Sequence, residues 1–391
     1  MNSGKTIFSQ ILDFIPWRKF NECVLRYAGD KPVYKLKCHE LFRIMLFAQI
    51  MRRESLSDIV ISLVSVRSNL YHAGIVSKLT KSKLARANNQ RSWRIFCDFA
   101  EVLRLRVEEL YERDKDIDIE VEGQIYALDS TIINLCMSLF PWAKYRSKES
   151  AVKAHTLLSV RGSIPDIILI SKGNMSDSSI MEYVNWESGS WYIMDKAYVD
   201  FDKLYSINTS HAWFVTRDKK NIKHKKVCSI KFNRGTGIVS DQKVKLTSAQ
   251  ARKEYPKPVR RIKYIDAETG TRLIFLTNNM DVDAVTIAKL YKSRWRVELF
   301  FKWIKQHLHV LTFFGRTVNA VKSQLWIAVC VYMLLLIIKK ELKLRQTQYQ
   351  LLQIFSMGVF HKTPIKSLFD EKELQLFRQL NSNQLELFQN P

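Results

Sequence analysis

The sequence predicts a mixed α/β protein with a helical N-terminal domain. Three observations lead to this prediction. Apolar residues recur at helical spacing from residue 1 to about 115, strand-like and helix-like runs alternate after residue 124, and apolar helical segments return after residue 285. A chain of 391 residues is also long enough for more than one domain and a large core.

Residues 1–118 are predicted to form a helical DNA-binding domain. Helical periodicity is clear at 7–15 and 41–51, and turn-forming residues occupy 29–32 between them. Ser55, Ser57 and Asp58 are candidate N-caps for a helix that begins near residue 59. The stretch 78–93 is rich in side chains that can contact phosphates: Lys78, Lys81, Lys83, Arg86, Asn88, Asn89, Gln90 and Arg91. A solvated basic face on a packing domain explains this stretch nearly as well, because charge runs are usually just solvated.

Residues 119–210 are predicted to form the first part of a catalytic core. An apolar run from residue 124 ends on Asp129, and a second follows at 132–135. Further strands are expected at 153–160 and 164–171, a helix at 175–184, and a strand from 191 that ends on Asp195. A helix at 201–207 completes this part, and a strand at 212–216 follows it. Both aspartates are thus expected at strand ends.

Residues 211–284 are predicted to be a basic, β-rich insertion that lies against nucleic acid. Strand-like runs occur at 237–240, 243–246, 263–265 and 272–277 between clusters of lysine and arginine. Helix is expected to return from 285 to 305 and again from 320 to 343. Residues 285–345 would form the second part of the core, and residues 346–391 a C-terminal helical tail.

The helix expected at 285–305 carries one narrow polar stripe. Tyr291, Arg294, Glu298, Lys302 and Lys305 fall within about 80° of its circumference, and apolar residues fill the other faces. We expect a buried helix whose charged stripe requires partners, because unpaired buried charge is costly. The alternative is an ordinary ion-paired surface stripe, since Arg294 and Glu298 are four residues apart.

Composition indicates a polyanionic partner in a reducing compartment. The formal net charge is +24, which favours nucleic acid or an anionic membrane surface. The membrane is the weaker option, because the apolar run 325–338 has 14 residues and a span needs about 20. The six cysteines are scattered and no secretion signal is recognisable, so we expect a cytosolic protein with reduced thiols. The histidines lack paired metal spacing, and no zinc is expected.

Three carboxylates suggest a hard-metal site. Asp129 and Asp195 at strand ends, with Glu298 on a helix, supply the oxygen ligands that a pair of Mg²⁺ ions requires for phosphodiester chemistry. Each carboxylate alone is a weak signal, because an aspartate at a strand end is more often a turn residue. The prediction of a metal site rests on the occurrence of all three carboxylates together with the polar stripe and the net charge.

The stripe resembles a known signature. Tyr291, Arg294, Glu298 and Lys305 match the Tyr-(2)-Arg-(3)-Glu-(6)-Lys pattern of bacterial insertion-sequence transposases of the DDE type, the "insertion sequence four" family. Asp129-Ser-Thr and Asp195-Lys-Ala-Tyr resemble that family's first and second catalytic blocks. The resemblance covers nearly the whole chain, apart from roughly the last forty residues.

This resemblance implies a ribonuclease-H-like core interrupted by a β-rich insertion. It implies that Asp129, Asp195 and Glu298 bind two Mg²⁺ or Mn²⁺ ions, which activate water and later a 3′ hydroxyl. Phosphate contacts are expected from four residues of the helix and from Arg217, although Lys219 and Lys220 would serve as well as Arg217. The four are Tyr291, Arg294, Lys302 and Lys305.

The resemblance also suggests a role for Trp295 and for the assembly. Trp295 would stack on an unpaired base at the transposon tip, and a core tryptophan is about equally compatible with the sequence. Lys153 and His155 lie two apart on an expected strand and so share one face, which could look toward the site. A structural role is nevertheless the expectation for both. The expected partners are terminal inverted repeats and target DNA, bound by a homodimer at the bacterial nucleoid.

The resemblance thus implies cut-and-paste transposition, and two other functions fit the same residues. A decayed transposase would act as a non-catalytic repressor, and a related metal-dependent nuclease would cleave without strand transfer. The presence of all three carboxylates with the whole stripe argues against decay.

Overall fold

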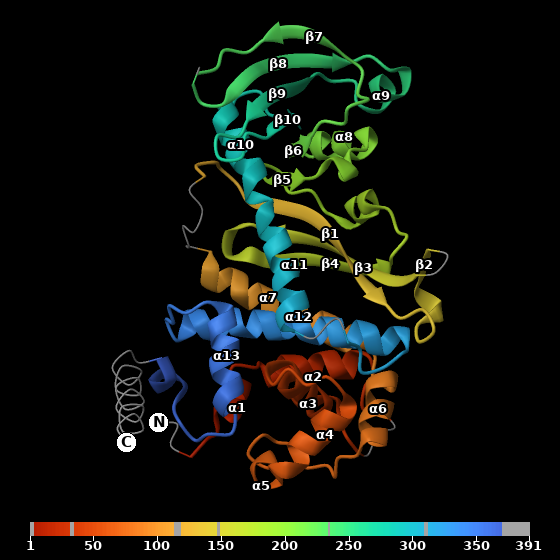
Figure 1. Ribbon diagram of the computed structural model, residues 1–391, viewed down its shortest axis with the longest axis vertical. Coiled ribbons are helices and arrows are strands. Elements are labelled where there is room, and N and C mark those ends of the chain that lie inside the picture. The colour runs from red at the N-terminus through yellow and green to blue at the C-terminus, as the bar shows by residue number, and fades with distance from the viewer. Residues whose placement is uncertain are drawn as a thin grey trace, which may run out of the picture. The chain divides into compact units, whose positions relative to one another are not determined.

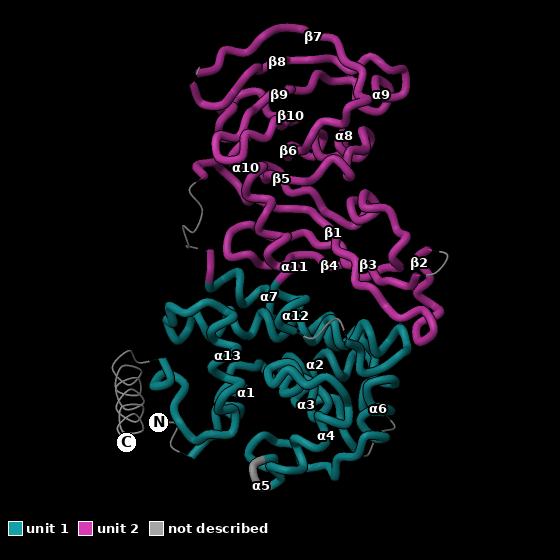
Figure 2. Tube along the Cα trace, in the orientation of Figure 1, with its two compact units in different colours: residues 1–110, 303–391 teal, residues 111–302 magenta. Residues whose placement is uncertain are grey.

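The chain folds into two compact units, which Figure 2 colours separately. Unit 1 comprises residues 1–110 and 303–391, and unit 2 comprises residues 111–302. The structure is a computed structural model that describes residues 4–31, 35–112, 119–146, 149–233, 235–308 and 312–369. The two ends of the chain therefore contribute to the same unit, and α11 (Trp295–His307) crosses the unit boundary.

Unit 1 is helical, as the periodicity of its first part predicts. Side-chain caps start several helices: Thr6, Ser55, Thr80, Thr317 and Thr347 each accept a backbone N–H from the first turn. The helices are α1 (Ile7–Asp13), α2 (Trp17–Arg26), α3 (Cys38–Ile50), α4 (Leu56–Ser65), α5 (Arg67–Leu70), α6 (Lys81–Gln90), α7 (Trp93–Tyr111), α12 (Val318–Glu341), α13 (Gln348–Gly358) and the 3-10 helix η5 (Ile365–Phe369).

Aromatic packing fills the centre of unit 1. The ring centroids of Phe20 and Phe42 lie 5.0 Å apart in a stacked arrangement, and Phe99 meets Phe20 edge-on at 5.0 Å. These rings come from α2, α3 and α7, so one cluster joins helices that are distant in sequence. Such pairs stabilise by about 0.5–1.5 kcal/mol beyond the area they bury.

The apolar helix α12 is a core helix. It spans 24 residues, longer than the apolar run alone suggested, and its length and composition would allow it to cross a membrane. However, 94% of its most apolar 18-residue window is buried inside the structure. It packs against α3, α6 and α13 (Figure 1). A helix covered by protein on all sides is apolar all round for that reason.

The basic stretch around α6 is only partly available to a ligand. Lys78, Lys81 and Arg86 are exposed. Arg91 is buried, and its guanidinium donates to the Leu36 carbonyl at 3.0 Å, so Arg91 supports the core and does not face a phosphate backbone.

The described strands of unit 2 form one sheet in the order β2-β3-β1-β5-β6-β10-β9-β8-β7, with β4 also paired to β3 (Figure 1). Strands β5 and β6 run parallel to β1, and β3 and β4 form an antiparallel extension. The strands are β1 (Ile125–Leu135), β2 (Lys144–Arg146), β3 (Glu149–Ser159), β4 (Ile164–Lys172), β5 (Trp191–Met194), β6 (Trp213–Arg217), β7 (His224–Ser229), β8 (Ile238–Leu246), β9 (Val259–Ile265) and β10 (Arg272–Thr277).

Helical segments connect or cover these strands. The α-helices are α8 (Phe201–Thr209), α9 (Ala249–Glu254), α10 (Ala284–Ser293) and the first part of α11. The segment expected as a helix at 175–184 is instead the 3-10 helix η3 (Asp177–Tyr183). The remaining short 3-10 helices are η1 (Pro141–Ala143), η2 (Arg161–Ser163) and η4 (Lys196–Tyr198).

The register of β1 against β5 is set where the two strands begin. Gly123 has a φ of +85°, and a Cβ at this position would lie 2.1 Å from the Gly189 carbonyl oxygen. Only glycine allows this approach of the two backbones. The Trp191 N–H then donates to the Gln124 carbonyl at 2.7 Å, and Ile125 pairs with Trp191.

The basic insertion extends the same sheet. Strand β10 pairs with β6 through Phe275 and Arg217, so β7 to β10 continue the order that begins in the core. The two short runs expected at 237–240 and 243–246 form a single strand, β8. The strand expected at 272–277 is present as β10.

Two arginines of the insertion are paired with acids. Arg260 and Asp241 are almost fully buried, and Arg260 Nη2 lies 2.6 Å from Asp241 Oδ2. Arg261 Nε lies 2.7 Å from Asp218 Oδ2. Arg260 therefore holds β8 to β9 and does not present its charge to nucleic acid. The surplus of positive charge that the sequence suggests on this region is correspondingly smaller.

We expect Asp241→Asn to lower the free energy of unfolding by about 3–5 kcal/mol, because it leaves Arg260 buried without a counter-charge. Urea denaturation followed by circular dichroism measures the loss. Glu120→Gln, at an exposed position of the same unit, is the control and should change little. A loss below about 1 kcal/mol in Asp241→Asn would show that the pair contributes little.

Candidate active site

Strand register brings Asp129, Asp195 and Arg217 together. Leu128 pairs with Met194, and Met194 pairs with Thr216. The residue that follows in each of the three neighbouring strands is therefore Asp129, Asp195 or Arg217. Because side chains alternate along a strand, all three project from the same face of the sheet.

The two aspartates differ in their position along the strand. Asp195 directly follows β5, as the sequence predicts. Asp129 does not end a strand, because β1 continues to Leu135 and pairs with β3 from Tyr126 to Leu135. Strand β5 covers β1 only as far as Leu128, so the β5 side of Asp129 is open. The opening beside Asp129 thus comes from the end of its neighbour and not from the end of its own strand.

The polar stripe lies on two consecutive helices. The helix expected at 285–305 is interrupted at Arg294, which is the C-cap of α10. The Arg294 N–H donates to the Tyr291 carbonyl at 3.1 Å, and the Val297 N–H donates to the Arg294 carbonyl at 3.1 Å. These bonds span three residues, so the backbone is tightened at this point. Tyr291 and Arg294 are thereby presented by the last turn of α10, and Glu298 by the first turn of α11.

Arg294 bridges two of the three carboxylates. Its Nη1 lies 2.7 Å from Asp129 Oδ2, and its Nη2 donates to Glu298 Oε1. The side chains of Arg294 and Asp129 are 15% and 19% exposed, so this contact is shielded from water. The ion-paired reading of the stripe is therefore correct for Arg294 and Glu298, but the pair also includes Asp129 from the sheet.

The third carboxylate has its own set of neighbours. The Tyr291 hydroxyl donates to Asp195 Oδ1 at 3.3 Å, and Arg217 Nη1 lies 3.9 Å from the same oxygen. The Thr216 hydroxyl donates to the Asp195 backbone carbonyl at 3.2 Å, which anchors the turn after β5. Tyr291 and Arg217 thus contact Asp195 from the helix and from the neighbouring strand.

The carboxylates act on one another electrostatically. Burial raises the pKa of Asp129, and the negative charges of Glu298 and Asp195 raise it further. The Arg294 guanidinium and the Ser130 N–H, which donates to Asp129 Oδ1 at 2.8 Å, oppose this rise in pKa. Burial lowers the pKa of Arg294, but Tyr291, Asp129 and Glu298 outweigh that effect and keep the guanidinium charged.

The donor set fits a hard divalent cation in kind. Carboxylate oxygens are the preferred ligands of Mg²⁺ and Mn²⁺, and Asp129 and Glu298 already share one cationic group. Among the described residues, however, no three His, Cys, Asp or Glu side chains lie close enough to hold one ion together. Arg294 contacts one oxygen of each of these two carboxylates, Asp129 Oδ2 and Glu298 Oε1.

Trp295 is not a core residue. Its side chain is 57% exposed, and Leu299, one turn along α11, is exposed as well. The expectation of a buried helix therefore holds at Val297 and Phe300 but is wrong at Trp295 and Leu299. Trp295 borders a pocket of about 420 Å³. We call this the aromatic pocket, and its lining includes Trp295, Tyr291, Tyr264, Phe275, Lys292 and Arg294.

The two lysines of the stripe differ in exposure. Lys302 is exposed, as expected of a side chain that would meet a ligand. Lys305 is partly buried, and burial lowers the pKa of its ammonium group. Lys305 lies on the part of α11 that belongs to unit 1, and its role beside the carboxylates stays a prediction.

A second pocket, of about 410 Å³, lies beside Arg217. The structure distinguishes three cations that the sequence does not rank: Arg217 faces Asp195, Lys219 donates to the Val199 carbonyl at 2.9 Å, and Lys220 is exposed. We call this the basic pocket, and the cations in its lining are Lys196, Arg217, Lys219, Lys220, Arg261 and Arg272.

Sequence reasoning missed several residues that line these pockets. Tyr264 and Phe275 come from β9 and β10, and nothing in the sequence connects them with Tyr291. The ring centroids of Phe275 and Tyr291 lie 4.9 Å apart. The sequence signal for this region is limited to the alternation of residues 272–277. It predicts a strand there but not that the strand lies beside Tyr291.

We expect Asp129→Asn to raise the thermal unfolding midpoint at pH 7 in metal-free buffer. A carboxyl with a raised pKa makes its full contribution to stability when protonated and loses it as pH rises through that pKa. The amide imitates the protonated form. A gain of about 0.5–2 kcal/mol would shift the midpoint by about 2–4 °C per kcal/mol.

The difference in unfolding midpoint between Asp129→Asn and the wild type should shrink as the pH is lowered, because the wild-type carboxyl then becomes neutral like the amide. Differential scanning calorimetry between pH 7 and pH 4 follows this trend. A variant that is less stable than the wild type at pH 7 would contradict the unfavourable ionisation of Asp129.

Comparison with known proteins relates the chain to one family. Residues 121–334 match the family described as "Transposase DDE domain", from just before β1 into α12. Residues 3–76 match a domain of unknown function (DUF4372). The first match covers all of the candidate site residues.

Named relatives agree with this match. The chain is 36% identical over 256 residues to a putative transposase, y4zB, of Sinorhizobium fredii (strain NBRC 101917 / NGR234), an alignment that covers 64% of this chain and 69% of the relative. It is 33% identical over 210 residues to a probable transposase for insertion sequence element IS5377 of Geobacillus stearothermophilus, covering 53% and 55% of the two chains. It is 26% identical over 255 residues to a putative transposase for insertion sequence element IS4SA of Synechocystis sp. (strain ATCC 27184 / PCC 6803 / Kazusa), covering 62% and 68%.

Proposed function

Because the chain belongs to the DDE transposase family and is therefore a DNA-cleaving transposase, we propose that it moves an insertion sequence by cut-and-paste transposition with Asp129, Asp195 and Glu298 as its catalytic carboxylates. The observation that carries the assignment is their arrangement. Strand register makes Asp129 and Asp195 neighbours, and Arg294 connects Asp129 to Glu298. Two of the three acids thus share Arg294, and the third follows the neighbouring strand on the same face of the sheet.

Divalent metal dependence is a general property of the DDE family. We assign Asp129, Asp195 and Glu298 as ligands of two Mg²⁺ or Mn²⁺ ions. Such ions, when bound, activate the attacking oxygen and stabilise the leaving oxygen of a phosphodiester. Burial, followed by the charges of Glu298 and Asp195, raises the pKa of Asp129. A bound cation would oppose this rise, which supports the assignment.

We further propose that unit 2 contains a ribonuclease-H-like core of the "insertion sequence four" type. The order β4-β3-β1-β5-β6 supports this, with β5 and β6 parallel to β1 and with β3 antiparallel to it. The signature residues Tyr291, Arg294 and Glu298 support it as well, because they converge on the two aspartates. The match at residues 121–334 is compatible with a core in two parts, 119–210 and 285–345.

The stripe is proposed to bind DNA phosphates. The Arg294 guanidinium can donate two hydrogen bonds to a phosphate once it leaves Asp129 and Glu298, which would free both carboxylates for metal. The Tyr291 hydroxyl can donate to a second phosphate oxygen. Lys302, and Lys305 on the neighbouring turn, would add point charges.

Trp295 is proposed to stack on an unpaired base at the transposon tip. Its exposed ring borders the aromatic pocket, whose volume of about 420 Å³ is within the range of small-molecule sites. Lys292 and Arg294 in the lining would balance the phosphate of the same nucleotide. Stacking of this kind is independent of sequence, because every base has a π face.

The basic pocket and unit 1 are proposed to hold flanking DNA. Lys220 and Lys196 are exposed in the lining of the basic pocket, and Arg217 connects that pocket to Asp195. Lys78, Lys81 and Arg86 of unit 1 are exposed and would contact the terminal inverted repeats. We expect a homodimer on DNA, because two element ends are joined, and we place the enzyme at the nucleoid in the cytoplasm.

Glu298→Gln is expected to lower cleavage of DNA that carries the element's inverted repeats by about 10³-fold or more, because a metal ligand and a charge are lost. Binding of the same DNA should stay within about twofold. Gel analysis of labelled duplex in Mg²⁺ measures cleavage, and fluorescence anisotropy measures binding.

Glu120→Gln is the matched control for that experiment, because Glu120 is an exposed glutamate of unit 2. This variant should cleave DNA at the wild-type rate. Cleavage by Glu298→Gln at the wild-type rate would refute the catalytic assignment. Wild-type protein that binds but never cleaves would indicate the repressor function, and cleavage without strand transfer would indicate the nuclease.

Trp295→Ala is expected to weaken binding of DNA ends with an unpaired terminal base by about 1–3 kcal/mol. Binding of a fully paired duplex should change less. Leu299→Ala, at a neighbouring exposed position on α11, controls for lost apolar surface. Anisotropy titrations with the two DNAs measure the difference, and equal losses for both DNAs would exclude base stacking by Trp295.

A further inference from the structure

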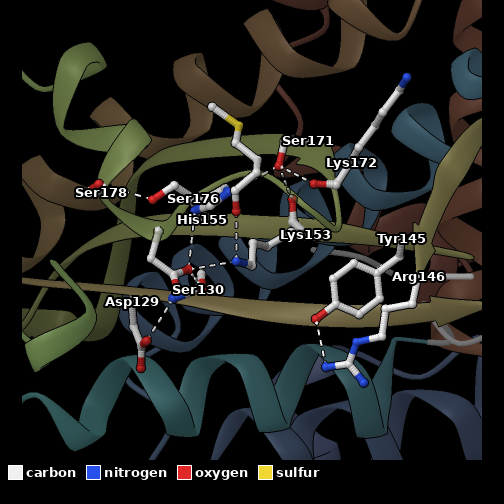
Figure 3. A network of polar contacts seen from close by, with 12 residues as sticks. Asp129, Ser130, Tyr145, Arg146, Lys153, His155, Ser171, Lys172, Ser176 and Ser178 are labelled. Atoms are coloured by element: carbon white, nitrogen blue, oxygen red, sulfur yellow. Dashed lines mark hydrogen bonds and ion pairs between the residues drawn. The ribbon is translucent and has the colours of Figure 1, made fainter. Parts of the chain in front are cut away.

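A polar cluster lies on the face of the sheet opposite to the Asp129 carboxylate. Ser130 pairs with His155 and Ile132 pairs with Lys153 across β1 and β3, so Ser130, His155 and Lys153 share one face. Asp129, one residue before Ser130, projects from the other face. Figure 3 shows the Asp129 carboxylate pointing away from Lys153 and His155.

Asp177 is the centre of this cluster. The Ser130 hydroxyl donates to Asp177 Oδ1, and Lys153 Nζ lies 3.0 Å from the same oxygen. Lys153 Nζ also donates to the Met175 carbonyl at 2.9 Å, which ties the loop before η3 to β3. Asp177 is the first residue of η3, so one carboxylate connects that helix with β1 and β3.

Two basic residues, Lys153 and His155, lie beside Asp177, and only Lys153 balances its charge. His155 Nδ1 lies 4.0 Å from Asp177 Oδ1, too far for a hydrogen bond, and its Nε2 lies 3.1 Å from the Ser171 hydroxyl. Burial lowers the pKa of His155 to about 4, with Lys153 contributing, so the imidazole is neutral at pH 7. The ion pair with Lys153, itself almost buried, is therefore what fixes Asp177.

The cluster also touches the segment after Asp195. Tyr198, in η4, is buried, and the pKa of its hydroxyl is raised by burial and then by the charges of Asp129 and Asp177. Tyr198 belongs to the same hydrophobic cluster as Leu128 and Leu157, which flank Ser130 and His155 on that face. Packing on the back of the sheet thus extends to the segments that carry both aspartates.

We propose that Asp177, held by Lys153, is a positioning residue that fixes Ser130 and through it the carboxylate of Asp129. The connection is short. The Ser130 side chain bonds Asp177 behind the sheet, and the Ser130 N–H donates to Asp129 Oδ1 at 2.8 Å in front of it. Asp177 is not itself assigned as a metal ligand. The inference rests on the proposed role of Asp129 as a ligand.

The test uses the full-length protein and two readouts. In metal-free buffer at pH 7, the ¹³C chemical shift of the Asp129 carboxyl, assigned with Asp129→Asn, reports the position of this side chain. Equilibrium binding of Mn²⁺, followed by electron paramagnetic resonance, reports the ligand set. Ser130→Ala and Asp177→Asn should both displace the Asp129 resonance and weaken Mn²⁺ binding about tenfold, as expected of a group that orients a ligand.

Conservative and control variants separate positioning from general stability. Ser130→Thr keeps the hydroxyl and should restore both readouts to near wild type. Asp202→Asn removes an exposed acid of the same unit and should change neither. The double variant Ser130→Ala/Asp177→Asn should bind Mn²⁺ no more weakly than whichever single variant binds it less tightly. The reason is that both changes break the same connection, the one between Ser130 and Asp177.

Two results would overturn the proposal. One is a folded Ser130→Ala protein with wild-type resonance and Mn²⁺ affinity. The other is a double variant whose loss is the product of the single losses, which would mean that Asp177 acts independently of Ser130. If Asp177→Asn does not fold, the comparison of Ser130→Ala with Ser130→Thr tests the proposal. If wild-type protein binds no Mn²⁺, the metal assignment fails, and the Asp129 resonance still tests the positioning.

Discussion

The pairing of β1 with β5 is the constraint on which the candidate site depends. A parallel pair that ends at Leu128 and Met194 makes the next two residues neighbours on one face, and both are aspartates. The register is fixed a few residues earlier by the close approach of Gly123 to the Gly189 carbonyl. The positions of two carboxylates thus follow from a backbone contact at the start of the strands, where no functional residue lies.

Charge neutralisation is the second organising influence on unit 2. Asp129 and Glu298 share Arg294, Asp241 holds Arg260, and Asp218 holds Arg261. Buried or half-buried charges have to be paired in this way because their desolvation is costly. The excess of basic residues therefore remains on exposed side chains such as Lys220 and Lys302, where it can act on a polyanion.

Much of this arrangement could be read from the sequence. The runs that lead to Asp129 and Asp195, the strand at 272–277, and the helical stripe from Tyr291 all correspond to features of the structure. These signals are local, because periodicity reports which face of a segment is apolar. The break at Arg294 was not predictable, since residues 291–298 contain neither glycine nor proline. Ring contacts across strands, as between Phe275 and Tyr291, depend on a pairing that periodicity does not encode.

Other errors had a similar origin. Asp129 was expected at a strand end because the apolar run stops there, yet β3 supports β1 beyond it. Trp295 was equally compatible with the core and the surface, because an aromatic residue on a helix gives no sign of which neighbour covers it. Asp177 had no signal at all, since a polar residue in a Ser-rich loop is ordinary until Lys153 and Ser130 are placed beside it.

The alternation of faces along β1 also limits how the length of this chain can vary. A single residue inserted between Gly123 and Asp129 would turn the carboxylate toward the side occupied by Tyr126 and Leu128, and would send Ser130 to the opposite side. The same insertion in the turn between β7 and β8 would leave the pairing of β1, β5 and β6 unchanged. Related proteins can therefore differ in length within the outer part of the sheet, whereas the few residues between Gly123 and Asp129 cannot change in number.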